Sequence, residues 1–393
     1  MSTHFDTIVI GLGAFGSATI YQLAKRGRAV MGIDRYAPPH TFGSTHGDTR
    51  ITRLACGEGP MYTATARRSH EIWRDIERQT EKQLLVQNGM LLISGAGRRA
   101  AAHGKDDFLG NTIDVARHNG VAHETLSDAD IRRRFPAFNI GDGDRGYFEP
   151  GAGFVFPEDC VATQLKLSVP LGAQIRIGET VTRIEPRGGK VEVTTDRGLY
   201  TATNAVLSAG PWLPQLLPQR KSLFTIRRQV LTWFAIDGAV MPLAQYRPEK
   251  FPVFYWQVPR RQAIYGFPWI GDGEPAVKLA AEQYDFETTP DTVDRNVSEQ
   301  EIRDMHHDYI AGFFPGVSDR CVKSAVCLYT CVDDARFIVD RLPGQPQIIV
   351  ASPCSGHGFK HSAAIGEALA EMACGHAPTK VSLDAFRFET EAA

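Results

Sequence analysis

The clearest pattern along the chain is an apolar strand, a glycine-rich turn and a helix within the first 35 residues. β-Branched side chains alternate over residues 7–10, glycines follow in the turn, and helical spacing of apolar positions covers residues 17–25. A second apolar run at residues 29–33 ends on Asp34. This order predicts a strand–helix–strand unit.

Period-two patterns dominate the middle of the chain. Residues 180–196 and 199–208 predict short antiparallel strands, because Gly188-Gly189 supplies a turn within the first segment and Asp196-Arg197-Gly198 supplies the turn before the second. A mostly antiparallel sheet is predicted further along, from β-rich segments at 229–234, 251–258, 263–267 and 276–279.

The remaining elements are read from helical periodicity and from short apolar runs. The predicted helices cover residues 61–79, a segment that begins at the N-cap Ser127 and ends before Pro136, 298–313, and 361–372. The predicted strands cover residues 90–93, 323–330 and 347–351. The last strand, the turn at 355–358 and the helix after it follow the same strand–turn–helix order as the N-terminus.

These elements indicate an α/β protein of two domains, since 393 residues exceed the size of a single core. We expect a Rossmann-like nucleotide-binding domain with a mainly parallel sheet, built from residues 1–84, 149–215 and 321–393. An α+β substrate-binding domain with a mostly antiparallel sheet is expected from residues 85–148 and 216–320.

Composition narrows the class of protein. The 43 Lys and Arg nearly balance the 45 Asp and Glu, so nothing indicates a nucleic-acid partner. No stretch approaches the roughly 18 to 20 apolar residues that span a bilayer, so no membrane association is expected. Seven scattered Cys without a CxxC pair indicate reduced thiols and a cytoplasmic protein.

The glycine turn predicts dinucleotide binding. In G-x-G-x-x-G, Gly11 forms the tight turn, Gly13 lets the backbone approach a pyrophosphate, and Gly16 lets the helix pack on the strand. Asp34, at the end of the second strand, is placed to accept ribose hydroxyl groups. The motif alone does not choose between FAD and NAD.

Four further segments carry a resemblance to a known family. They are residues 43–53 (GSTHGDTRITR), YGFP at 265–268 leading to Lys278, AVCLYT at 325–330, and SGHGFK at 355–360. With the glycine motif, they resemble the monomeric sarcosine oxidase and N-methyltryptophan oxidase group of the D-amino-acid-oxidase-like flavoproteins. The resemblance covers residues 6–375 and implies that the nucleotide is FAD.

The resemblance implies how the cofactor is held. Cys327 matches a cysteine whose sulfur is bonded to the flavin, although a Cys in an apolar strand is usually only a small buried hydrophobe. Arg50 matches a residue beside the flavin. The remaining cofactor-binding residues that we expect are Gly356, His357, Gly358 and Lys360, where a helix N-terminus favours negative charge on the ring.

The resemblance also assigns chemistry. Lys278 matches a lysine that assists oxygen reduction, and Arg50, His46 and Tyr265 complete the expected catalytic set. The expected substrate-binding residues are Arg53 and Lys360, which match a pair of cations for the substrate carboxylate, together with Tyr265 and Tyr329 as pocket walls.

A metal site is not expected. His357 and His361 lie four residues apart, as two metal ligands on a helix would. No third ligand or carboxylate partner falls at a supporting spacing, so we interpret these histidines as loop and helix residues.

The reaction that the resemblance implies is oxidation of a small secondary amino acid to an imine, with O2 reduced to H2O2, by a monomer. Two alternatives use a closely similar fold: a deglycating fructosyl-amino-acid oxidase, and a dehydrogenase that passes electrons to a quinone or another flavoprotein. A non-catalytic nucleotide-binding protein is a third, and it would need only the glycine motif.

Substrate identity stays open. Where the family has A-Y-G-E-G, this chain has Cys56 in place of the aromatic residue, which argues against sarcosine itself. Trp256 and Trp269, both in the substrate domain, are expected to add bulk to the substrate site, and Glu282 is expected to favour a cationic substrate group.

Overall fold

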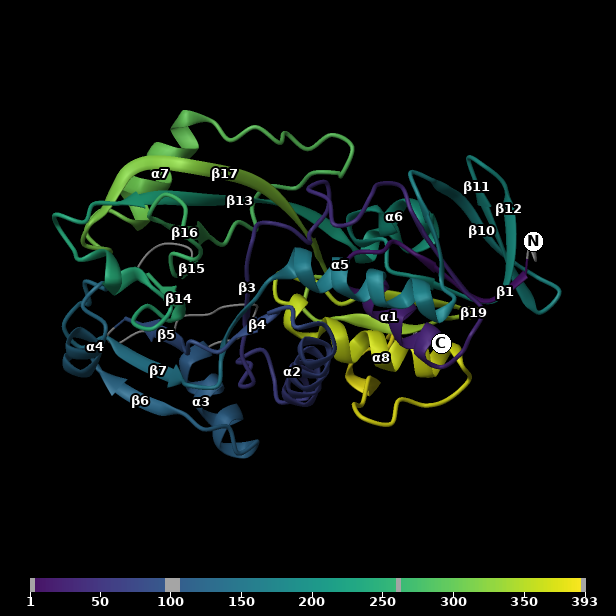
Figure 1. Cartoon of the computed structure of the whole chain (residues 1–393), viewed down its shortest axis with the longest axis horizontal. Helices are drawn as coiled ribbons and strands as arrows, with labels where there is room; N and C mark the ends of the chain where they lie inside the picture. The colour runs from purple at the N-terminus through teal and green to yellow at the C-terminus, as the bar shows by residue number, and fades with distance from the viewer. Residues whose placement is uncertain (1–3, 96–106, 259–262, 390–393) are drawn as a thin grey trace.

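The computed structural model describes residues 4–95, 107–258 and 263–389 and has two large β-sheets toward opposite ends of an elongated molecule (Figure 1). The first sheet is formed by strands from the two ends and the middle of the chain, and the second by strands from between them. The predicted α/β architecture, with one mainly parallel and one mostly antiparallel sheet, is confirmed.

The first sheet has a parallel centre. In spatial order its central strands are β19 (Gln345–Ser352), β12 (Leu199–Leu207), β1 (His4–Ile10), β2 (Val30–Asp34) and β9 (Gln174–Ile177). Antiparallel strands extend it: β10 (Val181–Arg187) and β11 (Lys190–Thr195) beside β12, and β18 (Ile338–Leu342) beside β19. The carboxyl ends of the parallel strands therefore meet at one edge, where ligands bind in such sheets.

Helices pack closely on this sheet. Helix α1 (Ala14–Lys25) contacts both α5 (Pro157–Ser168) and α8 (Ser362–Ala373), and α2 (Met61–Thr80) contacts α8. A Cβ added at Gly366 of α8 would lie 2.3 Å from the Ala18 Cβ of α1, so glycine is what lets these two helices approach. Apolar side chains from both helices and from the strands form one core.

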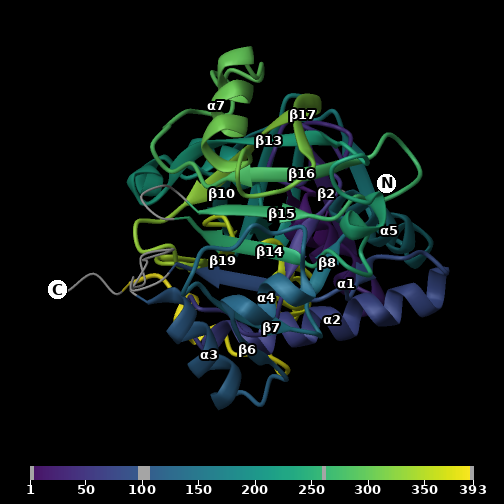
Figure 2. The same ribbon diagram turned by 90° about the vertical axis from the view of Figure 1, so that its left-hand side faces the viewer.

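The second sheet is antiparallel except between β14 and β5. Its order is β17 (Val317–Cys331), β13 (Thr225–Ile236), β16 (Ala276–Ala281), β15 (Ile264–Phe267), β14 (Val253–Gln257), β5 (Met90–Ser94), β7 (Arg145–Glu149) and β6 (Glu124–Ser127). Most of these strands can be followed one below another in Figure 2. Helices α3 (Phe108–His118), α4 (Asp128–Arg134) and α7 (Glu299–Tyr309) pack around it.

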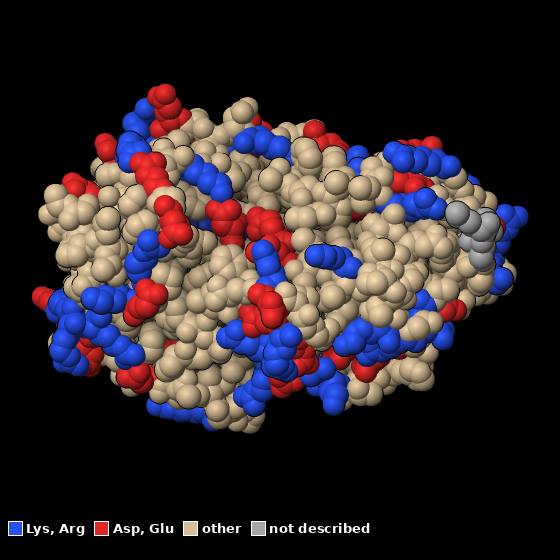
Figure 3. All heavy atoms as spheres, viewed as in Figure 1, with Lys and Arg blue, Asp and Glu red and all other residues tan. Residues whose placement is uncertain are grey.

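Short elements complete the fold. A small sheet is formed by β3 (Arg50–Thr52), β8 (Gly153–Val155) and β4 (Leu85–Val86), and α6 (Leu213–Leu216) follows β12. None of the helices formed by the described residues has both the length and the apolar character needed to cross a membrane. On the face in Figure 3, acidic and basic side chains are interspersed.

Several predicted element ends are confirmed by capping. Ser127 caps α4 and Ser298 caps α7, each in a reciprocal capping box with the residue three positions later. Helices α3 and α5 were not predicted, and strand β17 begins six residues earlier than expected, at Val317 rather than at 323. The domain boundaries stay a prediction; β17 crosses the expected boundary at 321 and pairs with β13 throughout.

One expected pocket residue is a core residue instead. Trp256 on β14 is 1% exposed and packs in the core of the second sheet, against Phe138, Phe313 and Phe314. The prediction that Trp256 adds bulk to the substrate site is therefore wrong. Its side chain faces the opposite side of the sheet from the cavity described below, because side chains alternate along a strand.

Candidate active site

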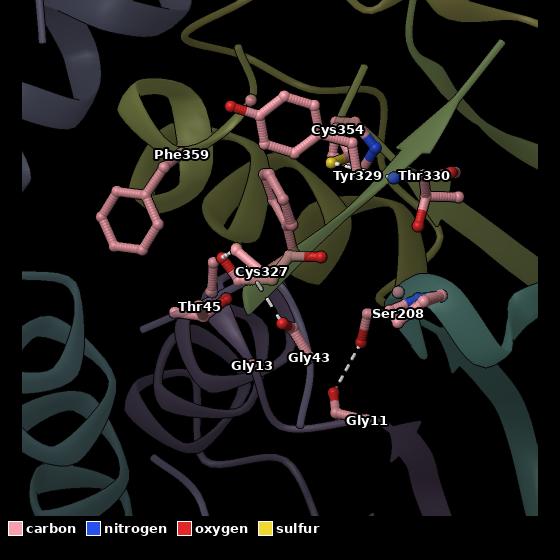
Figure 4. Close-up of a pocket in the computed structure, with 18 of the residues that line it drawn as sticks. Gly11, Gly13, Gly43, Thr45, Ser208, Cys327, Tyr329, Thr330, Cys354 and Phe359 are labelled. Carbon is pink, nitrogen blue, oxygen red and sulfur yellow. Dashed lines mark hydrogen bonds between the residues drawn. The ribbon is translucent and has the colours of Figure 1, made fainter. Parts of the chain in front are cut away.

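A long cavity runs from the carboxyl edge of the first sheet to the second sheet. Asp34 and Arg35 line it at the first sheet, and Tyr265 and Phe267 line it at the second. Figure 4 shows how residues from both ends of the chain meet there. Gly11 and Gly13 lie on one side of the cavity, and Cys327 and Tyr329 lie on the opposite side.

The glycine turn has the close contacts that its motif requires. Gly11 has φ +86°, and a Cβ there would lie 2.6 Å from the Ser208 carbonyl oxygen. A Cβ at Gly16 would lie 1.8 Å from the Gly11 oxygen, whereas the nearest atom to a Cβ at Gly13 is the Thr45 Oγ1 at 3.5 Å. Gly16 thus serves helix packing, while Gly11 and Gly13 line the cavity.

Asp34 organises this turn from the end of β2. Its carboxylate accepts hydrogen bonds from the Leu12 backbone N at 2.8 Å and the Tyr36 N at 2.9 Å. The His40 Nε2 lies 3.7 Å from the same side chain. Asp34 also lines the cavity, and its contact with a ribose stays a prediction.

Cys327 and Arg50 lie together at the other end of the cavity. The Arg50 Nη2 is 3.4 Å from the Cys327 Sγ and donates to the Ser44 carbonyl at 2.9 Å. The thiol itself donates to that carbonyl at 3.3 Å. Burial lowers the pKa of Arg50, but Cys327 and the nearby Tyr265 raise it overall, so the guanidinium stays charged.

Lys278 lies one carbonyl group away from this pair. It is buried, and its Nζ donates to the Gly47 oxygen at 2.6 Å and to the Thr49 oxygen at 2.8 Å. Burial and the positive charge of Arg50 hold the pKa of Lys278 well below its usual value. The lysine does not line the main cavity but a second cavity behind it.

His46 also lies outside the lining of the main cavity. It is 3% exposed, and burial and Arg50 lower its pKa to about 4, so its imidazole is neutral at physiological pH. The next residue, Gly47, has φ +96° and donates its N–H to Glu158 at 2.6 Å. His46 thus directly precedes the residue whose carbonyl oxygen accepts a hydrogen bond from Lys278.

The two cations expected to bind a carboxylate lie in the same cavity. Arg53 donates to both Glu58 oxygens, at 2.8 and 3.0 Å, and to the Ala55 carbonyl at 2.7 Å. The Lys360 Nζ donates to the His357 carbonyl at 2.6 Å. Burial lowers the pKa of Lys360, Cys56 and Glu58 act in the opposite direction, and Arg53 lowers it. Both cations line the main cavity.

Two tyrosines form a wall between β15 and β17. The Tyr265 and Tyr329 hydroxyl oxygens are 3.2 Å apart, and both residues line the cavity. Burial raises the pKa of Tyr265 to about 12, so it is a neutral phenol. A Cβ at Gly356, which has φ +81°, would lie 3.0 Å from the Tyr329 ring, so the glycine loop passes directly against this wall.

The loop after β19 brings a histidine to the cavity. The His357 Nε2 is 2.9 Å from the Ala335 carbonyl, and its ring stacks on Phe337 with centroids 4.6 Å apart. Gly358 has no room for a side chain, since a Cβ would lie 1.7 Å from the Pro353 oxygen. Lys360 then lies in the short helical turn Phe359–His361 before α8.

Residues that the sequence did not single out also contribute. Glu58 fixes the orientation of Arg53, and Ser208 hydrogen-bonds to the Gly11 oxygen at 2.8 Å. Ser208 ends the segment 199–208, which was expected to be an antiparallel strand. The observed strand β12 is antiparallel only to β11 and is parallel to β1 and β19, and polar residues at the ends of such parallel strands are the available signal. Nothing in the sequence pairs Glu58 with Arg53 beyond their spacing of five residues.

The cavity fits the cofactor that the sequence implies. Three buried hydroxyl oxygens that line it, on Ser44, Thr330 and Ser352, have no hydrogen-bond partner within the described protein. Buried polar atoms of this kind are normally satisfied, so they point to a ligand with polar atoms of its own. Among the described residues, no group of three or more His, Cys, Asp or Glu is arranged to hold a metal ion.

Comparison with known proteins gives the family. Residues 6–372 match the DAO model, described as FAD dependent oxidoreductase. The chain is 36% identical to a monomeric sarcosine oxidase of Streptomyces avermitilis, over 95% of this chain and 94% of that protein. It is 33% identical to an N-methyl-L-tryptophan oxidase of Yersinia pestis, over 97% and 98%. The protein belongs to the DAO family of FAD-dependent oxidoreductases, and it is an enzyme of that class.

Solved structures agree on the fold. NikD, an unusual amino acid oxidase essential for nikkomycin biosynthesis, superposes with a TM-score of 0.82 at 23% identity, covering 98% of both chains. Amadoriase I of Aspergillus fumigatus superposes with a TM-score of 0.72 at 20% identity, covering 97% of this chain and 89% of its own.

Proposed function

We propose that the protein oxidises the C–N bond of an N-methyl or other N-alkyl amino acid to an imine, with O2 reduced to H2O2. The observation that carries this proposal is the position of Arg53 and Lys360, which come from distant parts of the sequence and lie in the same cavity as the dinucleotide motif. The names of the curated relatives support the same class of substrate.

The protein's own groups orient the amine. Arg53 and Lys360 would bind the substrate carboxylate, because a guanidinium fork and an ammonium in a dry cavity suit an anion. Tyr265 and Tyr329 would confine the rest of the molecule. When bound, FAD supplies the two-electron acceptor for the C–H bond beside the nitrogen, and no protein nucleophile is needed.

We further propose that the flavin is attached covalently at Cys327. Cys327 is 1% exposed and lines the cavity, and its Sγ lies 3.4 Å from the Arg50 Nη2. The test is acid precipitation of the purified yellow protein. Colour kept in the pellet and lost from it in Cys327→Ser supports attachment, whereas colour in the supernatant of the unchanged protein contradicts it.

The reaction is tested by a peroxide-coupled screen. N-Methyl and N-alkyl amino acids, including N-methyltryptophan and sarcosine, are compared with their primary amino acids and with fructosyl amino acids. Peroxide only from the N-alkyl series supports the proposal. Peroxide only from fructosyl compounds indicates deglycation, and anaerobic flavin reduction without peroxide under air indicates a dehydrogenase.

We also propose a cytoplasmic monomer. All seven Cys side chains are free thiols in the structure, which suits a reducing compartment. Curated relatives are named monomeric sarcosine oxidases. Light scattering of the purified protein measures the oligomeric state, and a mass near the chain's 43.3 kDa is expected.

A further inference from the structure

A second cavity lies behind Lys278, apart from the one that would hold the cofactor and the amine. Its walls are mostly apolar and include Trp233, Trp269, Ala276 and Val322. Trp269, which was expected to line the substrate site, therefore lines this second cavity instead. The cavity begins among partly exposed residues of the second sheet and ends on the buried ammonium group of Lys278.

A row of cations and aromatic rings crosses the sheet beneath this cavity. In strand order it runs Lys323 on β17, Trp233 on β13, Lys278 on β16 and Phe267 on β15, and each residue is the register partner of the next. The Lys323 Nζ lies 4.5 Å from the Trp233 ring centroid, and the Lys278 Nζ lies 4.4 Å from that of Phe267. The Lys323 side chain is half exposed and forms an ion pair with Asp48 at 2.7 Å, whereas Lys278 is buried.

One backbone carbonyl separates this cavity from the main one. The Thr49 oxygen accepts from the Arg50 Nη1 at 2.8 Å and from the Lys278 Nζ at 2.8 Å. Arg50 lines the main cavity, Lys278 lines the second, and Phe267 lines both. A small molecule that reaches Lys278 from behind is thus within a few atoms of the groups around the cofactor.

We propose that this second cavity is the route by which dioxygen reaches the site, separate from the route of the amine. The inference rests on the proposed oxidase function. Dioxygen is small and apolar, as the aromatic and aliphatic walls require, and it gains negative charge on reduction, which the buried ammonium group stabilises. Dioxygen takes two electrons and one proton from the reduced cofactor and one proton from water, and leaves as hydrogen peroxide.

A separate route has a kinetic consequence. Dioxygen can arrive while the imine still fills the main cavity, so reoxidation need not wait for product release. Narrowing the second cavity therefore slows reoxidation and leaves reduction by the amine unchanged. Ala276 suits this test, because it lies two residues before Lys278 on β16 and so faces the same side of the sheet.

The experiment uses Ala276→Leu and Val322→Phe, since both residues line the second cavity. Ala325→Leu is the matched control, because Ala325 is on the same sheet but lines neither cavity. The reduced holoenzymes are mixed with dioxygen in a stopped-flow instrument. The second-order rate constant should fall about tenfold in the first two variants and stay unchanged in the control, while anaerobic reduction by the amine stays the same in all three. Equal reoxidation in all proteins, or equal losses in both half-reactions, would overturn the proposal.

Xenon gives a readout that does not depend on turnover. Crystals of the holoenzyme pressurised with xenon should show the gas in the second cavity, and crystals of Ala276→Leu should not. Xenon bound only in other cavities contradicts the proposed route. If the unchanged enzyme is reduced by amines but never reoxidised by dioxygen, the oxidase function fails as well, and the two failures are thereby distinguished.

Discussion

Arg53 is held in a buried ion pair with Glu58. Variants of these two residues can therefore distinguish a role of Arg53 in substrate binding from a role in folding. Arg53→Gln should lower kcat/KM for an N-alkyl amino acid about 30-fold or more, because losing a buried charge-assisted contact costs about 2–5 kcal/mol. Steady-state kinetics under air measure the effect. Since the variant leaves the Glu58 carboxylate without its bidentate partner, the double variant Arg53→Gln/Glu58→Gln is the control for stability.

The outcome for Arg53 is decided by comparing these two variants. A double variant that regains thermal stability but not kcat/KM supports carboxylate binding by Arg53. Full recovery of kcat/KM in the double variant would show that Arg53 has only a structural role.

Lys278 makes reoxidation sensitive to pH. Because burial and Arg50 lower its pKa well below 10.5, with Asp48, Glu158 and Cys327 acting in the opposite direction, its ammonium is lost at a lower pH than that of an ordinary lysine. The rate constant of the reduced enzyme with dioxygen should therefore fall as the pH rises through that lowered pKa. In Lys278→Met the rate should be low and flat with pH. A sloping profile that persists in the variant would assign the titration to another group.

At the residue scale, what the sequence can predict depends on distance along the chain. The glycine turn is local, so the tight turn at Gly11 and the close packing of Gly16 against it follow from the motif, whereas their contact with the distant Ser208 does not. Cys327, Arg53 and Lys360 could be brought together only by resemblance to a family, because no periodicity links segments so far apart. The position of Lys278 behind the main cavity depends on the fold of the Gly47 to Thr49 loop and could not be predicted.

Helices α1 and α8 touch at Gly366, which is an element-scale feature with a measurable cost. Gly366→Val should destabilise the protein by about 1–3 kcal/mol, because a side chain there overpacks the contact with Ala18. Thermal unfolding measures the change. Gly273→Val is the matched control, since a Cβ at Gly273 meets no atom within 4 Å. Equal melting temperatures for the two variants would contradict this account of the helix contact.

A buried histidine joins α2 to β3 and makes that contact sensitive to acid. The His70 Nε2 lies 2.6 Å from the Thr52 Oγ1, and burial lowers the pKa of His70 from 6.5 to about 4. Between these two values the unfolded chain binds a proton that the folded chain does not, so the free energy of unfolding falls as the pH falls from about 6.5 to about 4.

The size of this effect is tested with His70→Gln, which keeps a polar group near Thr52. Denaturant unfolding at pH 7 and pH 5 should show a larger loss of stability in the unchanged protein than in the variant, by about 1–2 kcal/mol. Parallel losses in the two proteins would mean that His70 does not contribute.

Helices and strands were predicted correctly where apolar residues recur with a clear period. They were missed or shortened where a segment is buried on several sides or begins among exposed residues. The first strand–helix–strand unit and the capped helix α4 are confirmed because their patterns are local. Helix α5 is buried on several sides against α1, so its sequence lacks a clear polar face. Strand β17 begins among the exposed residues Asp319 and Arg320, which give no apolar alternation to read.

At the scale of the whole molecule, the main cavity, which we propose holds the cofactor, is lined by both sheets. Gly11, Asp34 and Ser208 come from the first sheet and its turns, whereas Tyr265 and Cys327 come from the second. A sequence can predict each sheet from its own pattern, but the cavity between them depends on how the sheets pack. A ligand that contacts both sheets links them, so its binding free energy adds to the stability of the fold.

This linkage predicts that loss of FAD destabilises the entire molecule rather than one loop. Cys327→Ser, dialysed free of flavin, should melt at a lower temperature than the same variant saturated with FAD, because binding only to the folded state stabilises by RT ln(1 + [L]/Kd), about 2.7 kcal/mol at one hundred times Kd. Differential scanning calorimetry measures the difference, and NAD at the same concentration is the control ligand. Unfolding should stay a single transition in both forms; a separate early transition in the flavin-free form, or identical melting with FAD and NAD, would show that the cofactor does not link the two sheets.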